Sequence, residues 1–183
     1  MAVRGRLCLA GFGLLLGGCA QPDEQIAVPA PVPVLVDAPA GSAGGACRLL
    51  DFALVEEATG VRFDVAAASE QGDTHSCVIR AEQQAVPDLT LSVSETSIDL
   101  AAFKADLMPK GARAVPGLGR AAYRLTVAPA SKQGPVAEVA WLAEDGRLAS
   151  LRYTLPVGQV RADAEGFTPK LVTLAKQVDT RAL

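Results

Sequence analysis

The residues with the most distinctive chemistry in this chain of 183 residues are its four cysteines. Cys19 follows the tripeptide Leu-Gly-Gly, and a lipoprotein signal peptidase requires small residues just before the cysteine. Arg4 and Arg6 supply the positive start of such a signal, and Leu7–Leu16 supplies its apolar stretch. We therefore expect a lipoprotein signal peptide over residues 1–18 and a palmitate-bearing lipid anchor on Cys19.

The expected membrane attachment is a lipid anchor, because the apolar stretch is shorter than the roughly 20 residues that span a bilayer. An ordinary secretory signal cleaved nearby is the alternative, and Cys8 leaves with the signal in either case. The protein would then lie on the extracytoplasmic face of the cell membrane. Loss of Arg4 and Arg6 removes two positive charges and changes the net charge from −3 to −5. An acidic protein of this kind is not expected to bind nucleic acid, which needs lysine and arginine opposite its phosphates.

Cys47 and Cys77 are the cysteines that remain, and such a pair in an exported domain is most simply a disulfide. The bond would close a loop of about 30 residues, for which the lost entropy of the unfolded chain gives on the order of 3.5 kcal/mol. A metal site is the competing interpretation. It lacks a ligand set, because the thiols are far apart and the chain has one histidine.

His75 is that histidine, so any histidine-dependent catalysis rests on one residue in a polar loop. Glu70 and Asp73 are near it in the sequence and could hold a cation with it, but such residues are common in surface loops. Ser150 lies in a strand-like segment without the Gly-x-Ser-x-Gly turn of hydrolases. We therefore predict no catalytic site, no metal site and no cofactor.

Positive charge gathers in residues 104–124, where five basic residues accompany one acid, for a net charge of +4. The segment could meet anionic lipid headgroups or a wall polymer, each basic residue near a membrane contributing about 1 kcal/mol. The simpler interpretation is a solvated surface that keeps the domain soluble. The basic residues are Lys104, Lys110, Arg113, Arg120 and Arg124, and the acid is Asp106.

Residues 19–46 are rich in proline, alanine and glycine, and Val28–Val34 alternates proline with small apolar residues. This composition favours extended polyproline II and is typical of a semi-rigid spacer. We expect a tether over 19–46, with Gly41–Gly45 as a flexible joint; an unselected disordered linker is the alternative. Residues 47–183 have the usual size of one domain.

Three helices are predicted in this domain. Asp51 is placed to cap the first, which Gly60 ends. The second is expected from Ser97 to Met108. Thr168 is expected to cap the third, with Pro169 at its first position.

Strands are predicted where apolar and polar residues alternate. A tight turn at Asp145-Gly146 is expected to join the last two into a hairpin. The resulting order α-β-β-β-α-β-β-β-α favours an α+β domain, an antiparallel sheet with about three helices packed on one face. The expected strands are Val61–Val65, Cys77–Ala81, Leu89–Val93, Arg120–Val127, Val136–Ala143 and Leu148–Leu155.

Three segments together resemble a family of small actinobacterial lipoproteins of unknown function. They are Cys47-Arg48-Leu49-Leu50 at a helix start, Ser76-Cys77-Val78-Ile79 on a strand, and Val115-Pro116-Gly117-Leu118-Gly119-Arg120-Ala121-Ala122. The resemblance covers most of the chain from Cys47 to the last helix. It implies an exported, lipid-anchored α+β domain and supplies no catalytic residue.

The function expected from these features is a non-enzymatic binding or sensing module of the cell envelope. Its partner would be an envelope protein or a wall component. A carrier of a lipid or small apolar ligand is the alternative, because an aliphatic sequence with few aromatic residues could leave a hollow between sheet and helices. An envelope hydrolase is a third possibility, with Ser150, His75 and Glu70 as its few candidate residues.

Overall fold

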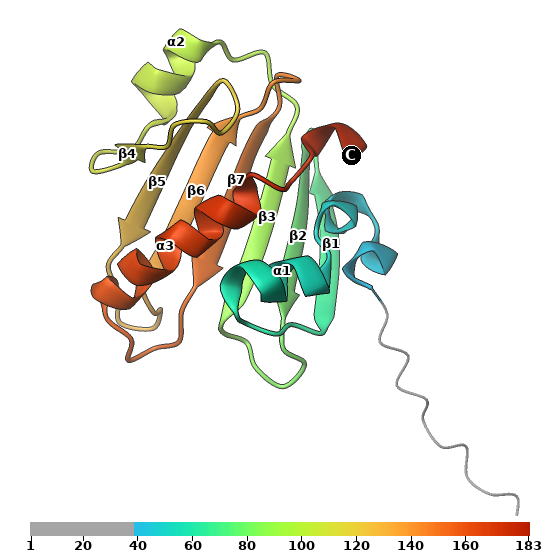
Figure 1. The fold of residues 1–183 in the computed structure, drawn as a ribbon, viewed down its shortest axis with the longest axis vertical. Helices are drawn as coiled ribbons and strands as arrows, with labels where there is room; N and C mark the ends of the chain where they lie inside the picture. The colour runs from blue at the N-terminus through green and yellow to red at the C-terminus, as the bar shows by residue number, and fades with distance from the viewer. Residues whose placement is uncertain (1–38) are drawn as a thin grey trace, which may run out of the picture. The chain divides into compact units, whose positions relative to one another are not determined.

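A seven-stranded antiparallel sheet forms the centre of the computed structural model, which describes residues 39–183 (Figure 1). The strands lie in the order β1-β2-β3-β7-β6-β5-β4. Strands β1 to β3 form one meander and β5 to β7 form a second, and the pairing of β3 with β7 joins the two. The strands are β1 Val65–Gln71, β2 Thr74–Arg80, β3 Asp88–Ser94, β4 Arg113–Ala114, β5 Ala121–Val127, β6 Val136–Leu142 and β7 Leu148–Thr154.

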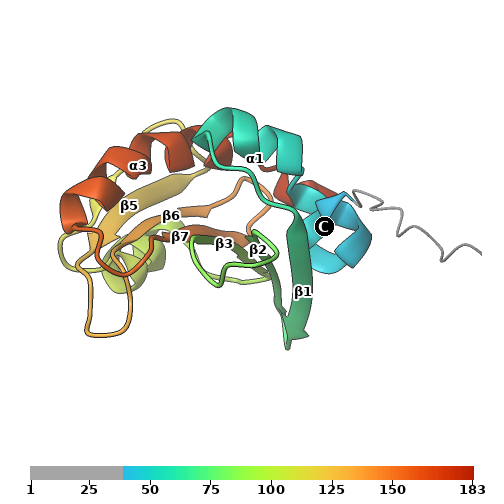
Figure 2. The same cartoon turned by 90° about the horizontal axis from the view of Figure 1, so that it is seen from below.

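Three helices flank the sheet, namely α1 (Phe52–Thr59), α2 (Leu100–Ala102) and α3 (Arg161–Ala175). α2 continues as a π-helical turn over Phe103–Leu107. α1 and α3 lie side by side on one face, whereas α2 lies on the other (Figure 1, Figure 2). The α+β class and the predicted order of elements are confirmed, with β4 as a short addition. The expectation that all helices share one face is wrong.

A separate apolar cluster explains the position of α2. Alternate strand residues point to opposite faces, so each face of the sheet can hold its own core. Beneath α1 and α3, Leu91 is fully buried and Tyr153 stacks on Phe167 with ring centroids 3.7 Å apart. On the opposite face Phe103 is fully buried beside Tyr123, with centroids 6.0 Å apart. Burial of Phe103 therefore holds α2 on the face that α1 and α3 leave open.

The local signals around α1 are confirmed. The Asp51 carboxylate accepts the backbone N–H of Ala53 at 2.8 Å, which satisfies an otherwise unpaired amide of the first turn. Gly60 ends the helix with φ of 73°, a left-handed conformation that glycine adopts without a Cβ penalty. Leu50 and Val55, on either side of the helix start, are both buried.

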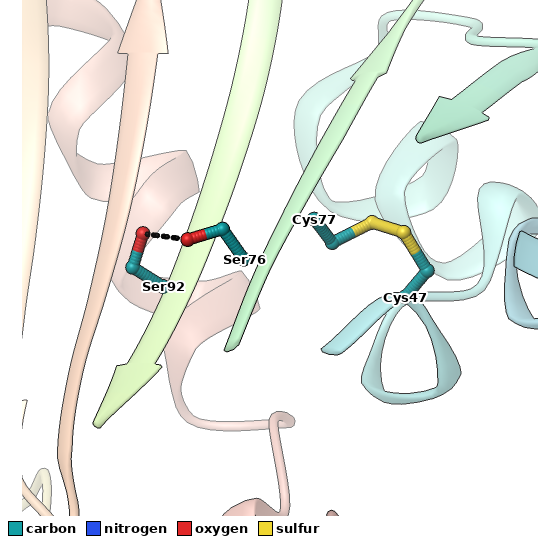
Figure 3. The surroundings of a disulfide bond; sticks show 4 residues. All are labelled: Cys47, Ser76, Cys77 and Ser92. Carbon is teal, nitrogen blue, oxygen red and sulfur yellow. Dashed lines mark hydrogen bonds between the residues drawn. A yellow bond between two sulfur atoms is a disulfide. The ribbon is translucent and has the colours of Figure 1, made fainter. Parts of the chain in front are cut away.

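The predicted disulfide is present and joins a short 3-10 helix, Gly45–Leu49, to β2 (Figure 3). Cys47 and Cys77 are both fully buried in the core beneath α1 and α3. The bond therefore attaches the chain that precedes α1 to the sheet itself. It ties a 3-10 turn, not the helix expected there, to the strand.

The structured part of the chain begins before Cys47. Residues Ala40–Ala43 form a further 3-10 turn that lies against β1, and the glycine-rich joint expected at Gly41–Gly45 is part of this packed structure. Ala40 and Ala46 are 1% and 0% exposed, because their small side chains let these turns approach the sheet closely. The rest of the expected tether lies outside the described residues.

The predicted start of the last helix is wrong, because α3 begins with Val160 as its N-cap residue. The Asp163 carboxylate accepts the Val160 N–H at 2.8 Å, so the first turn is already stabilised well before the proline. Thr168 lies within the helix, where its hydroxyl donates to the carbonyl of Ala164. Pro169 is also internal, although proline removes one hydrogen bond of the helical ladder.

Two other predicted boundaries differ from the structure. Asp99, rather than Ser97, caps α2, and its carboxylate accepts the Ala102 N–H at 2.8 Å. The strand expected from Val61 starts only at Val65. Phe63 is nonetheless 3% exposed. The alternation of apolar residues over Val61–Val65 therefore indicates that Phe63 is buried in the core, but not that this segment pairs as a strand.

The segment Gly117-Leu118-Gly119 forms a turn that leads from β4 into β5. Gly117 and Gly119 both have positive φ, 71° and 54°. A Cβ on Gly119 would lie 2.3 Å from the carbonyl oxygen of Leu142, whereas a Cβ on Gly117 would meet nothing within 4 Å. The Arg120 N–H donates to the same Leu142 carbonyl at 2.8 Å. The second glycine is therefore required by a close backbone approach as well as by its φ.

We expect Gly119→Ala to destabilise the domain more than Gly117→Ala. Both substitutions place a side chain at positive φ, which costs about 1–3 kcal/mol. Only Gly119→Ala also forces a Cβ against the Leu142 carbonyl, and the difference in the free energy of unfolding should be at least about 1 kcal/mol. Chemical denaturation of the two variants measures it, and equal losses would contradict the close approach.

Candidate functional site

Hydroxyl side chains cross four strands on the face of the sheet opposite α1 and α3. The register aligns Ser69, Ser76, Ser92 and Ser150 as one row across β1, β2, β3 and β7. The hydroxyls of Ser76 and Ser92 are hydrogen-bonded at 3.0 Å, on the side away from the disulfide (Figure 3). Neighbouring strands lie about 4.8 Å apart, so the row presents donors and acceptors at a regular interval.

This row ends in a cavity of about 350 Å³, which we call the hydroxyl cavity. Its floor consists of neighbouring cross-strand rows on β3, β7, β6 and β5. Leu107, from the π-helical turn after α2, forms part of the wall, so α2 borders the site. The lining residues are Thr90, Ser92, Ser94, Leu107, Tyr123, Glu138, Ala140, Leu148, Ser150 and Arg152.

Glu138 is the charged centre of this cavity. Its carboxylate accepts the Tyr123 hydroxyl at 3.1 Å and lies 3.8 Å from the guanidinium of Arg152. The Glu138 side chain is 18% exposed and that of Arg152 is 43% exposed. The cavity therefore combines an oriented carboxylate and a guanidinium with hydroxyls that both donate and accept.

The pKa of Tyr123 is raised from 10.0 to about 12, first by burial and then by the charge and hydrogen bond of Glu138. Tyr123 therefore remains a neutral hydrogen-bond donor at neutral pH and cannot serve as a base there. Next to the cavity, burial raises the pKa of Asp88, although hydrogen bonds with Thr154 and Thr90 and the charge of Arg152 partly oppose it.

Ser150 and His75 do not come together. Ser150 lies in the hydroxyl cavity on β7, opposite Ser92 of β3. His75 precedes Ser76 on β2, and because strand residues alternate between faces it lies on the other side of the sheet. The Nδ1 atom of His75 is 3.5 Å from a carboxylate oxygen of Glu70 on the neighbouring strand β1.

The sequence grouped Asp73 with this pair as a possible cation site. In the part of the chain that the structure describes, no group of three His, Cys, Asp or Glu side chains is placed to hold a metal ion. The expected lipidation site, Cys19, lies outside the described residues. Within residues 39–183, no helix is long and apolar enough to cross a membrane.

The basic segment does not form one continuous surface. Arg113 and Arg124 are direct partners on β4 and β5. Lys104 lies on the π-helical turn, on the opposite face of the sheet. The positive charge that the sequence places in one segment is thus divided between two sides of the molecule.

Tyr123, Glu138 and Arg152 are not among the site residues predicted from the sequence. A signal for two of them exists, because Glu138 is the one charged residue of the apolar strand β6 and Arg152 is a polar residue of the alternating strand β7. Alternation places each on the outward face, but it does not reveal that β6 and β7 are neighbours with these residues opposite each other.

Comparison of the chain with family models, with curated proteins and with solved structures found no match. The resemblance to the actinobacterial lipoproteins therefore stays a prediction.

We expect Glu138→Gln to lower the pKa of Tyr123 below about 12 but not to 10.0, because the charge is removed while the burial remains. The measurement is a titration of tyrosinate absorbance in a Tyr153→Phe background, since Tyr153 is the other tyrosine of the chain. Glu144→Gln, on an exposed turn, is the control and should leave the titration unchanged.

The same pKa has a consequence for stability. An unfolded tyrosine ionises near 10.0, while folded Tyr123 keeps its proton until about pH 12. The free energy of unfolding should therefore be independent of this group below pH 10 and fall between pH 10 and 12. Ionisation of Tyr123 near pH 10 in the folded protein would contradict its burial beside Glu138.

Proposed function

We propose that this protein is a lipid-anchored binding module on the extracytoplasmic face of the cell membrane, and that its ligand is a wall glycan. The observation that carries the proposal is the hydroxyl cavity with its Tyr123–Glu138–Arg152 cluster. The predicted lipid anchor on Cys19 supports the location, and the proline-rich residues after it support a tether.

The chemistry of the lining favours a polyhydroxylated ligand. Thr90, Ser92 and Ser150 supply hydroxyls that donate or accept, Glu138 accepts and Arg152 donates. A sugar ring needs this mixture, because each of its hydroxyls both donates and accepts. Leu107 and Leu148 add a small apolar surface against which the C–H face of a sugar can pack. A glycan chain that leaves the cavity would continue along the serine row towards Ser69.

The structure favours neither of the two alternatives, a lipid carrier and a serine hydrolase. A lipid carrier needs an apolar hollow, but the space beneath α1 and α3 is filled by side chains such as Leu91, Leu151 and Leu171, each 0% exposed. A serine hydrolase needs a base beside its nucleophile, and His75 is on the other side of the sheet from Ser150. A binding role requires neither feature.

We expect Ser150→Leu to reduce retention on protein-free wall glycan from the host by at least tenfold. Leucine removes a central hydroxyl and fills the cavity between Ser92 and Ala140. The measurement is co-sedimentation of the protein with the insoluble glycan. Thr173→Leu, on the exposed side of α3, is the matched control and should be retained like the wild type. Equal retention of all three proteins, with unchanged melting temperatures, would refute the assignment of this cavity.

The anchor is tested separately. Cys19→Ala should abolish incorporation of labelled palmitate, because acylation uses the thiol of that residue. Cys8→Ala is the matched control and should be labelled like the wild type, since Cys8 is expected to leave with the signal peptide. Intact labelling of Cys19→Ala, measured by radioactivity in the purified protein, would show that the anchor has been misassigned.

A further inference from the structure

We propose a second binding site, for a phosphate group, between strands β4 and β5 and the first turns of α3. It is formed by the guanidinium groups of Arg113, Arg124 and Arg161, which line a cavity of about 190 Å³. This site is separate from the hydroxyl cavity, and the proposal does not rest on the wall-glycan function.

The fold brings these arginines together from distant parts of the sequence. Arg113 and Arg124 are direct partners in the β4–β5 ladder, so their side chains lie on the same face. Ala122, two residues before Arg124 on β5, is buried in the core beneath α3, which identifies this face as the one towards α3. Arg161, Glu165 and Thr168 of α3 complete the lining at spacings of four and three residues, which place them on one side of the helix.

The charges of this cavity are unbalanced. Within residues 39–183, neither Arg113 nor Arg124 has a carboxylate within 4.0 Å, whereas Arg161 pairs with Glu165 at 2.9 Å. Like charges directly opposite each other on neighbouring strands are unfavourable. Three guanidinium groups face a single carboxylate, and a bound anion would offset the excess positive charge.

The donor geometry indicates phosphate rather than a simple halide. A guanidinium donates two parallel N–H groups, which match two oxygens of one phosphate. The Thr126 hydroxyl, also in the lining, adds a neutral donor. Glu165 would compete with the phosphate for Arg161, so this carboxylate should weaken the affinity of the site. The phosphate could belong to a lipid headgroup or to a ligand in solution, and both present the same chemistry.

The experiment is a calorimetric titration of the full-length protein with inorganic phosphate in dodecyl maltoside micelles, which contain no phosphate group. We expect saturable binding that Arg124→Ala weakens at least tenfold and that Glu165→Gln strengthens severalfold. Arg120→Ala is the matched control, because it removes a charge from the same basic segment outside the cavity, and it should bind like the wild type. Arg124→Lys keeps the charge without the paired N–H groups and should also bind more weakly.

A second arm identifies the source of the phosphate. Phosphatidate added to the phosphate-free micelles should weaken the apparent affinity for inorganic phosphate if a lipid headgroup occupies the site, and leave it unchanged if the ligand comes from solution. Both outcomes support the site. The proposal is overturned if the wild type shows no saturable binding, or if Arg120→Ala loses as much affinity as Arg124→Ala, which would indicate unspecific attraction to the basic segment.

Discussion

The pairing of β3 with β7 is the contact on which the rest of the structure depends. It joins two meanders that are separate in sequence into one sheet, and its register places Leu91 opposite Leu151 on one face and Ser92 opposite Ser150 on the other. A shift by one residue would exchange the faces of every side chain in a strand. It would then expose the leucines and bury the serines, so the apolar core and the polar cavity are set by the same register.

The two faces of the sheet serve different purposes. Beneath α1 and α3 the side chains are mainly apolar and buried, with Tyr153 stacked on Phe167, and the Cys47–Cys77 disulfide lies among them. The opposite face carries hydroxyls, a carboxylate and a guanidinium, and among residues 39–183 the small cluster around Phe103 holds α2 there. A polar ligand on that face would meet Tyr123 and Ala140 of this cluster as well as the polar groups.

The two proposed sites lie on different sides of the sheet and have different chemistry. Hydroxyl groups with one ion pair suit a neutral, polyhydroxylated ligand, while the excess of guanidinium groups near α3 suits an anion. In the two proposals, one face contacts a wall polymer and the other a phosphate. Each site can be tested without the other, because they share no lining residue.

Local interactions were predictable from the sequence alone, because the residues involved are close along the chain. The Asp51 cap, the end of α1 at Gly60 and the alternation of β3 and β7 depend only on neighbours, and the disulfide followed from there being just two cysteines within residues 47–183. The start of α3 was missed because Pro169 suggested a first turn, while the Asp163 carboxylate already stabilises an earlier start at Val160.

Only the tertiary structure decided that α2 lies on the other face, where Phe103 packs in an apolar cluster. The tertiary structure also decided that Glu138 lies opposite Arg152 and that Arg113 and Arg161 line one cavity. The alternation of residues along a strand predicts the face on which a side chain lies, but not which strand is its neighbour.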